Sequence, residues 1–136
     1  MLILDTNVIS AVRRAGRAPQ VAAWLDRQSE SELYLSVVTL GEIERGIAMQ
    51  MRRDPGFAED LRVWLDRTVR LFSDRILEFG AEDALVWGRL SAELGHGGAD
   101  LMIAAQGLSR DAAVVTGNGA DFERTGVRLI DPFTAP

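Results

Sequence analysis

The spacing of apolar residues changes several times along the chain, and these changes separate predicted strands from predicted helices. Short apolar runs closed by polar or turn residues are typical of strands buried on both faces. The first run, Leu2 to Leu4, is closed by Asp5 and predicts such a strand. The segments that we expect to form strands are 2–4, 33–37, 75–79, 112–115 and 127–130.

Between these runs the apolar residues recur three or four positions apart, as they do in amphipathic helices. The clearest case places Leu40, Ile43, Ile47 and Met51 on one helical face. The predicted helices are 6–14, 19–28, 39–53, 57–71, 81–94 and 100–109, with a short one at 119–124. Strands that alternate with helices indicate a parallel sheet covered by helices on both faces, an α/β fold.

Composition limits the class of protein. The 136 residues suit one domain, and 47% of them are apolar, enough for a buried core. The absence of cysteine excludes disulfides and thiolate metal sites. No apolar run approaches the roughly 20 residues of a membrane span, and the first residues carry an acid where a signal peptide carries positive charge. We therefore expect a cytoplasmic protein without a membrane segment.

The charge of the chain restricts how it can meet nucleic acid. A formal net charge of −5 argues against nonspecific binding by overall charge. Every basic side chain except the one histidine is arginine, since the sequence holds no lysine. Any cationic contact to a phosphate must therefore come from a guanidinium group, which suits bidentate binding.

Four acidic residues stand where ligands gather in this class of fold. Asp5 closes the first strand, and Glu42 lies one turn into the helix after the second. Asp100 opens the helix that follows a glycine-rich loop, and Asp121 comes soon after the fourth strand. Because ligands in parallel sheets bind beyond the carboxyl ends of the strands, the four can converge on one rim.

Taken singly, each acid is explained at least as well by helix capping. The candidate caps are Asp5, Asp100, the capping-box pair Thr39–Glu42 and the similarly spaced pair Asn118–Asp121. Taken together, clustered carboxylates repel one another unless a cation is present. Oxygen ligands without His or Cys suit Mg²⁺ or Mn²⁺, and such ions assist attack by water on a phosphoryl group.

Four sequence blocks carry these acids, in the order LILDTNVIS, LSVVTLGEIERG, ADLMIAAQGL and VVTGNGADF. Together they resemble the PIN domain, and more specifically the toxin ribonucleases of VapBC-type toxin–antitoxin pairs. The closing RLIDPF resembles the last strand of that family. The resemblance implies a single PIN domain over 1–136, a three-layer α/β/α fold with a five-stranded parallel sheet.

The resemblance also implies an activity and partners. It implies an endoribonuclease that depends on Mg²⁺ or Mn²⁺, cleaves RNA phosphodiesters with a metal-activated water, and is the toxin of a type II pair. Its partners would be the RNA substrate, a cognate antitoxin that places a segment in or near the catalytic groove, and a second copy in a homodimer. The helix at 57–71 is a candidate wall of an antitoxin groove, because apolar grooves accept amphipathic helices.

The resemblance assigns the site residue by residue. The expected catalytic residues are Asp5, Glu42, Asp100 and Asp121, of which Asp5 and Asp100 match the most direct metal ligands. The expected supporting residues are Thr6, Asn7, Thr116 and Asn118.

The late motif departs from many relatives, which carry Arg where this chain has Gly117. Arg13, Arg14 and Arg45 are candidates to supply the missing phosphate contact, and the residues leave the choice open. The single histidine, His96, is interpreted as a solvated loop residue.

Other functions fit the residues less well. A strand followed by Asp also opens haloacid-dehalogenase-like phosphatases, but those need a second Asp where this chain has Asn7, and a lysine. A receiver-like module would also need a lysine. The remaining alternative is a catalytically inactive PIN-like module for protein binding or regulation. It predicts the loss of an acid, and all four are present.

Overall fold

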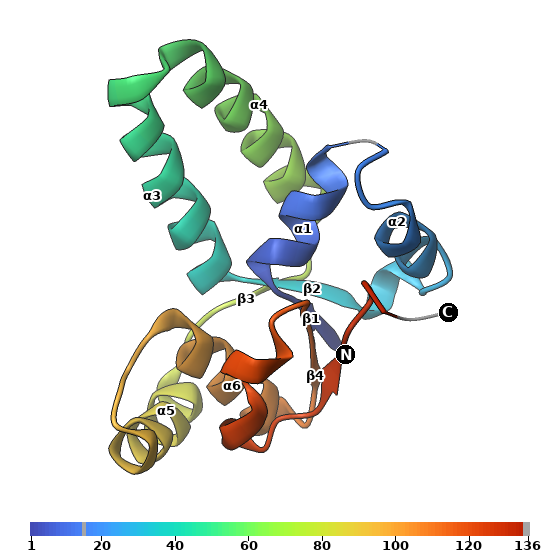
Figure 1. The fold of residues 1–136 in the computed structure, drawn as a ribbon. Coiled ribbons are helices and arrows are strands. Elements are labelled where there is room, and N and C mark those ends of the chain that lie inside the picture. The colour runs from blue at the N-terminus through green and yellow to red at the C-terminus, as the bar shows by residue number, and fades with distance from the viewer. Residues whose placement is uncertain (15, 135–136) are drawn as a thin grey trace.

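A five-stranded parallel sheet forms the centre of the molecule in the computed structural model, which describes residues 1–14 and 16–134. The strands are β1 (Leu2–Leu4), β2 (Leu33–Ser36), β3 (Ile76–Leu77), β4 (Ala113–Val115) and β5 (Leu129–Ile130). Their order across the sheet is β3-β2-β1-β4-β5, which places β1 in the middle (Figure 1). The predicted α/β fold with five parallel strands is confirmed.

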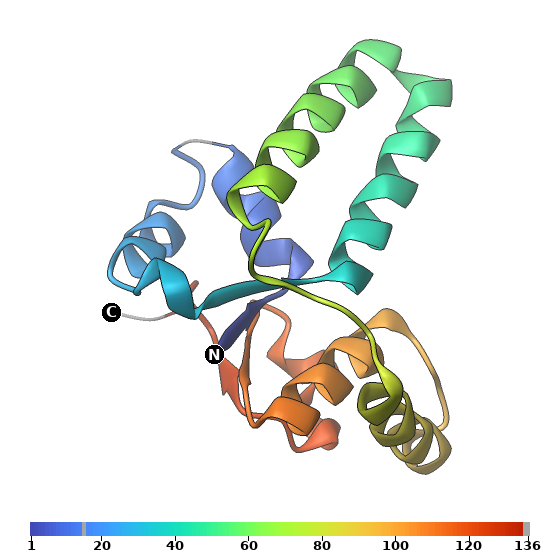
Figure 2. The ribbon, with the colours of Figure 1, turned by 180° about the vertical axis from the view of Figure 1, so that it is seen from behind.

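Helices cover both faces of this sheet, as Figures 1 and 2 show from opposite sides. On one face lie α1 (Thr6–Arg13), α2 (Pro19–Asp26), α3 (Val37–Arg53) and α4 (Pro55–Leu71). On the other lie α5 (Ala81–Leu94) and α6 (Ala99–Arg110). The short helix predicted at 119–124 is instead two 3₁₀ turns, Gly119–Asp121 and Glu123–Thr125. None of the helices in the described part of the chain is long and apolar enough to cross a membrane.

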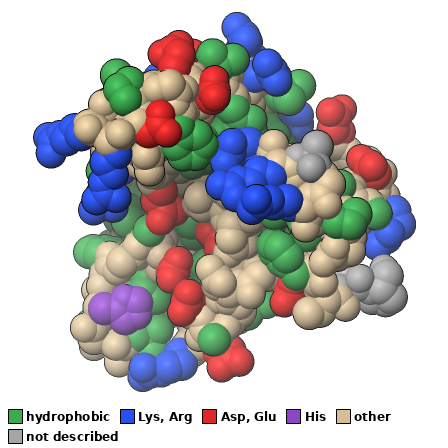
Figure 3. All heavy atoms as spheres, turned by 45° about the horizontal axis from the view of Figure 1, so that its top comes forward, with side chains coloured by type: hydrophobic (Ala, Val, Ile, Leu, Met, Phe, Trp, Pro, Cys, Tyr) green, Lys and Arg blue, Asp and Glu red, His purple; other side chains and the backbone are tan. Residues whose placement is uncertain are grey.

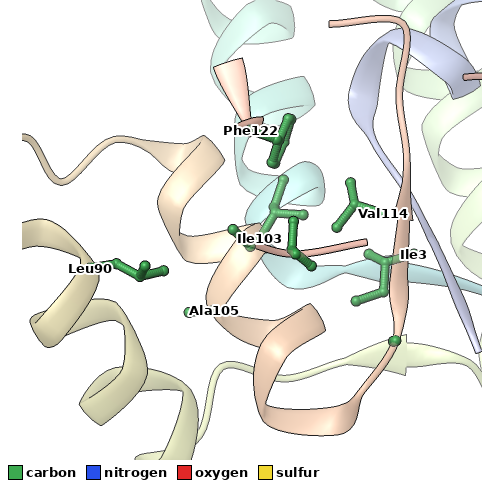
Figure 4. Close-up of a cluster of buried hydrophobic side chains, with 9 residues drawn as sticks. Ile3, Leu90, Ile103, Ala105, Val114 and Phe122 are labelled. Atoms are coloured by element: carbon green, nitrogen blue, oxygen red, sulfur yellow. The ribbon is translucent and has the colours of Figure 1, made fainter. Parts of the chain in front are cut away.

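Alternation along the central strands divides the core between the two faces. Ile3 and Val114 pack with α5 and α6, whereas their neighbours Leu4 and Val115 pack with α1 and α2. Figure 4 shows the first of these clusters, in which Phe122 also lies. Full burial of one such side chain contributes about 1.5–3 kcal/mol. Apolar strands buried on both sides therefore hold the three layers together.

Helices α3 and α4 form a long hairpin with a small core of its own. Ile43, Ile47 and Leu65 are buried where the two helices meet. Met51, predicted on the same apolar face, is 53% exposed because it lies near the tip of the hairpin, beyond these contacts. Asp54 caps α4, since its carboxylate accepts a hydrogen bond from the backbone N–H of Phe57 at 3.1 Å.

The start of α3 corrects the predicted capping box. The helix begins at Val37, two residues earlier than expected, and Ser36 is its N-cap. The Ser36 hydroxyl accepts a hydrogen bond from the backbone N–H of Val38 at 3.0 Å. Thr39 therefore lies inside the first turn, and its buried hydroxyl has no hydrogen-bond partner among the described residues. The Thr39–Glu42 capping box is wrong because the last strand residue already supplies the cap.

A buried amide joins this helix start to the opposite face of the sheet. Gln106 of α6 is fully buried and accepts a hydrogen bond from the Ser36 hydroxyl at 2.5 Å. Its amide nitrogen donates to the carbonyl oxygens of Leu77 and Glu78 at 3.3 and 3.2 Å. The contact ties α3, which carries Glu42, to the middle of α6.

The pair Ser36 and Thr39 gives a test of these two hydroxyl groups. We expect Ser36→Ala to lower the free energy of unfolding by about 2 kcal/mol, because it removes a cap and leaves a buried amide oxygen without its donor. Thr39→Val should be neutral or stabilising, because it removes a buried hydroxyl that has no partner. Urea denaturation of both variants measures the difference. A larger loss for Thr39→Val than for Ser36→Ala would restore the capping box.

Candidate functional site

Asp5 lies where the central strand ends and α1 begins. Its side chain is 5% exposed in the folded chain. One carboxylate oxygen accepts a hydrogen bond from the Thr6 backbone N–H at 2.9 Å. The other accepts from the Asn7 amide at 3.1 Å and from the Thr116 hydroxyl at 2.8 Å. Asp5 is therefore the N-cap of α1, as one of its two interpretations required, and roughly one of its four acceptor sites stays free for a ligand.

Thr116 follows β4 and organises the residues around Asp5. Besides donating to Asp5, its hydroxyl oxygen accepts from the Asn7 amide at 3.1 Å and from the Asn118 backbone N–H at 3.0 Å. The Asn7 carbonyl oxygen accepts from the Gly117 backbone N–H at 3.0 Å. Two of the four expected supporting residues, Asn7 and Thr116, thus join the ends of β1 and β4, and Asn118 bonds to Thr116 through its backbone.

Glu42 reaches the same place from α3. Its side chain is exposed, and Oε1 accepts a hydrogen bond from the Thr6 hydroxyl at 2.8 Å. Thr6 thereby bonds to Asp5 through its backbone and to Glu42 through its side chain. This contact places the carboxylate of α3 beside the first turn of α1.

Asp100 and Asp121 complete the group, although neither capping interpretation holds for them. Gly98 is the N-cap of α6, so Asp100 lies within the first turn. Asn118 precedes the 3₁₀ turn that holds Asp121, but its side chain makes no capping hydrogen bond. Asp100 is half-buried and Asp121 exposed. The backbone, and not the local sequence pattern, decides both cases. Helix α6 begins before Asp100 is reached, and the turn of Asp121 forms without a hydrogen bond from the Asn118 side chain.

The four carboxylates act on one another electrostatically. Burial raises the pKa of Asp100 above its usual value, and the charges of Asp5, Asp121 and Glu42 raise it further, while His96 lowers it. Burial also raises the pKa of Asp5, against the opposing effect of the hydrogen bonds from Thr116 and Thr6. Figure 3 shows acidic side chains gathered in the hollow between the upper and lower parts of the molecule, beside the histidine. We call the four residues Asp5, Glu42, Asp100 and Asp121 the acidic rim.

The donor atoms of the acidic rim suit a hard divalent cation. They are carboxylate oxygens, with hydroxyl and amide groups behind them, and this chemistry favours Mg²⁺ or Mn²⁺ over Zn²⁺. Within residues 1–14 and 16–134, no three His, Asp or Glu side chains stand close enough to enclose an ion unaided. Mg²⁺ commonly uses one or two carboxylates and keeps several waters. Asp5 and Asp100 could therefore hold it with water in the remaining positions.

A pocket of about 230 Å³ opens beside the acidic rim. Its lining residues are Leu94, His96, Asp100, Ala120, Asp121 and Arg124. The sequence interpretation did not single out Arg124, although its position three residues after Asp121 predicts that both side chains lie on one side of a helical turn. His96 is exposed, in agreement with its interpretation as a solvated loop residue.

The loop that leads to Asp100 rests on Trp87. A Cβ atom at Gly97 would lie 2.8 Å from the Trp87 ring, so only glycine lets the loop approach so closely. The same reason explains Gly117. A Cβ atom there would lie 2.7 Å from the Phe133 ring, which therefore covers the position where the resemblance led us to expect Arg.

The candidate replacements for that Arg lie elsewhere. A groove of about 540 Å³ runs between α1, α3 and α4, and both Arg13 and Arg14 line it. The Arg13 guanidinium lies over the rings of Phe57 and Trp64, 5.5 and 5.9 Å from their centres. Arg45 is exposed on α3. None of the three lines the pocket that contains Asp100 and Asp121.

The acids at the ends of parallel strands, in this order, agree with the comparison to known families. The sequence matches the family model of the PIN domain over residues 2–128. The chain belongs to the PIN-domain family. The resemblance found in the four sequence blocks is thereby confirmed.

The chain is also similar to individual proteins with known names and structures. Ribonuclease VapC14 of Mycobacterium tuberculosis is 48% identical over 71 residues, which make up 52% of this chain and 69% of that protein. Toxin FitB of Neisseria gonorrhoeae is 31% identical over 139 residues, 98% of this chain and 99% of that protein. The crystal structure of FitAcB from Neisseria gonorrhoeae superimposes with a TM-score of 0.85 at 29% identity, covering 99% of this chain and all of that one.

The burial of Asp100 in this PIN domain, together with the repulsion within the acidic rim, predicts that the stability of the fold depends on pH. Because its folded-state pKa is raised, Asp100 destabilises the metal-free fold when ionised, and the effect is absent below the usual pKa of aspartate. Asp100→Asn should therefore raise the melting temperature at pH 7.5 in EDTA, and the gain should shrink toward pH 4. Asp60→Asn, an exposed change on α4, is the control and should show no such trend. A gain that is equal at both pH values would rule out the ionised Asp100 carboxylate as its cause.

Proposed function

We propose that this chain is a Mg²⁺- or Mn²⁺-dependent endoribonuclease and the toxin of a type II toxin–antitoxin pair. In this proposal residues 1–136 form a single PIN domain that acts on RNA in the cytoplasm. The acidic rim carries the proposal, because burial and then three neighbouring charges raise the pKa of Asp100, and a bound cation would offset both effects. The names of its relatives, a VapC ribonuclease and a toxin, support it.

The proposal gives each carboxylate a part. A bound divalent ion would supply the positive charge that lets a water lose its proton and attack an RNA phosphorus atom. Asp5 and Asp100 are its proposed ligands, and the three hydrogen bonds to Asp5 hold that side chain in one orientation. Glu42 and Asp121, the other two residues of the rim, can orient water or bind the cation through water.

The supporting residues keep these carboxylates in place. Thr6 orients Glu42 and Asp5 together, and Thr116 and Asn7 fix the second oxygen of Asp5. Asn118 follows Thr116 in the turn, with its side chain free to reach substrate or water. A protein-binding module without catalysis would gain nothing from four mutually repelling acids, so we favour the enzyme over that alternative.

The partner of such a toxin is an antitoxin, and the fold offers a surface for one. The groove between α1, α3 and α4 has apolar walls that include Leu61 and Trp64 of the helix predicted for this part. It begins at Thr6, so a segment bound there would reach the acidic rim. We propose that the cognate antitoxin occupies this groove, and that the chain acts as a homodimer.

Glu42 gives a test of catalysis that leaves the fold intact. Glu42→Gln keeps an oxygen that can accept the Thr6 hydroxyl but removes the negative charge. We expect normal stability and at least a tenfold loss of RNA cleavage in Mg²⁺ or Mn²⁺, about 1.4 kcal/mol of transition-state stabilisation. Glu44→Gln is the matched control, because Glu44 faces Arg62 on another side of α3. Equal activity of the two variants would remove Glu42 from the site.

The toxin role is tested in cells. Expressed without an antitoxin, the wild-type chain should arrest growth, because uncontrolled RNA cleavage stops protein synthesis. Asp5→Asn should relieve the arrest at an unchanged level of soluble protein, since it removes a proposed metal ligand. Growth curves and immunoblots of both strains measure this, with Asp60→Asn as a variant that should stay toxic. A toxic Asp5→Asn chain would show that catalysis at this site does not cause the arrest.

A further inference from the structure

Arg124 lies in a short turn whose backbone is fixed by a buried residue before it and another after it. Its 3₁₀ turn is flanked by Phe122, which is fully buried, and includes the buried Thr125. The Thr125 hydroxyl donates to the Phe122 carbonyl oxygen at 2.6 Å. Arg124 is exposed, and it lines the pocket beside the acidic rim from this held backbone.

Among the residues that the structure describes, Arg124 has no salt-bridge partner, in contrast to four other arginines. Arg62, Arg75, Arg110 and Arg128 each form a salt bridge with an acid. Arg124 forms none in the described part of the chain, although it lines one pocket with Asp100 and Asp121. Its donors are therefore available to a ligand that enters the pocket.

The chemistry of the pocket identifies that ligand. An RNA phosphate is repelled by four carboxylates as it approaches, so a cation close to them is needed in addition to any bound metal. A guanidinium can bind two phosphate oxygens at once. Arg124 shares a pocket with two rim carboxylates, whereas the Arg13 guanidinium already lies over two aromatic rings in another groove.

We propose that this pocket is a phosphate subsite for the RNA substrate and that Arg124 binds a phosphate of the RNA backbone there. The inference rests on the proposed ribonuclease function and adds the residue that meets the substrate anion. His96 also lines the pocket and offers a further polar group. Because Arg124 holds substrate while the carboxylates serve the chemistry, its loss should affect substrate binding more than turnover.

The test compares Arg124→Gln with Arg128→Gln. Arg128 precedes β5, at the amino end of the strands and away from the acidic rim, and its substitution removes the same charge. We expect Arg124→Gln to raise KM for a labelled single-stranded RNA about tenfold with a smaller change in kcat. RNA binding is measured in the Asp5→Asn background, where RNA stays intact. There Arg124→Gln should make the fall of the log binding constant with log salt concentration less steep by about 0.7, the value for one phosphate contact. Arg128→Gln should change neither quantity.

Arg124→Lys separates binding from folding. It retains the charge, so the salt dependence should persist while affinity falls through loss of the bidentate geometry. If wild type cleaves RNA but Arg124→Gln matches Arg128→Gln in KM and salt slope, the subsite is wrong and the proposed function stands. If Arg124→Gln loses only antitoxin binding, the pocket is a protein contact and the inference also falls. A wild-type chain that neither binds nor cleaves RNA with Mg²⁺ or Mn²⁺ would overturn the function and the subsite together.

Discussion

The hydrogen bonding of one buried carboxylate is the constraint on which the rest of the site depends. Asp5 ends the central strand, and a backbone N–H, an amide and a hydroxyl hold it there. These donors offset part of the cost of burying charge, and they also join β1 to β4. The position of Asp5 is therefore set by the same contacts that align the strand ends, and the other acids are arranged around it.

Two further carboxylates come from helices on opposite faces of the sheet, and a buried contact relates them. Ser36 caps α3 and Gln106 lies in the middle of α6, so their hydrogen bond links the helix of Glu42 to the helix of Asp100. Burial of Asp100, and after it the closeness of like charges, raises the pKa of this carboxyl group, so its ionised form destabilises the metal-free site. Apolar burial in the three layers offsets this loss of stability. Such unfavourable clusters of charge are typical of sites that bind a ligand.

Much of the fold followed from local patterns. The runs at 2–4, 33–37 and 112–115 became β1, β2 and β4 because buried parallel strands need continuous apolar residues. Capping was less predictable. Ser36 is the N-cap of α3 although it ends a strand, and Gly98 is the N-cap of α6 although Asp100 has the better capping side chain. A capping motif describes which residues can cap a helix, whereas the sheet decides where the chain turns.

By itself the sequence determined the alternation of strands and helices, the four acids and the family to which the chain belongs, because these depend on residues close together or on whole motifs. Only the tertiary structure decided which partners meet. It paired Asp5 with Thr116, covered Gly117 with Phe133 and opened a pocket between Asp100 and Arg124. Such contacts join residues from separate elements, and their geometry follows from how the layers pack, which no local spacing encodes.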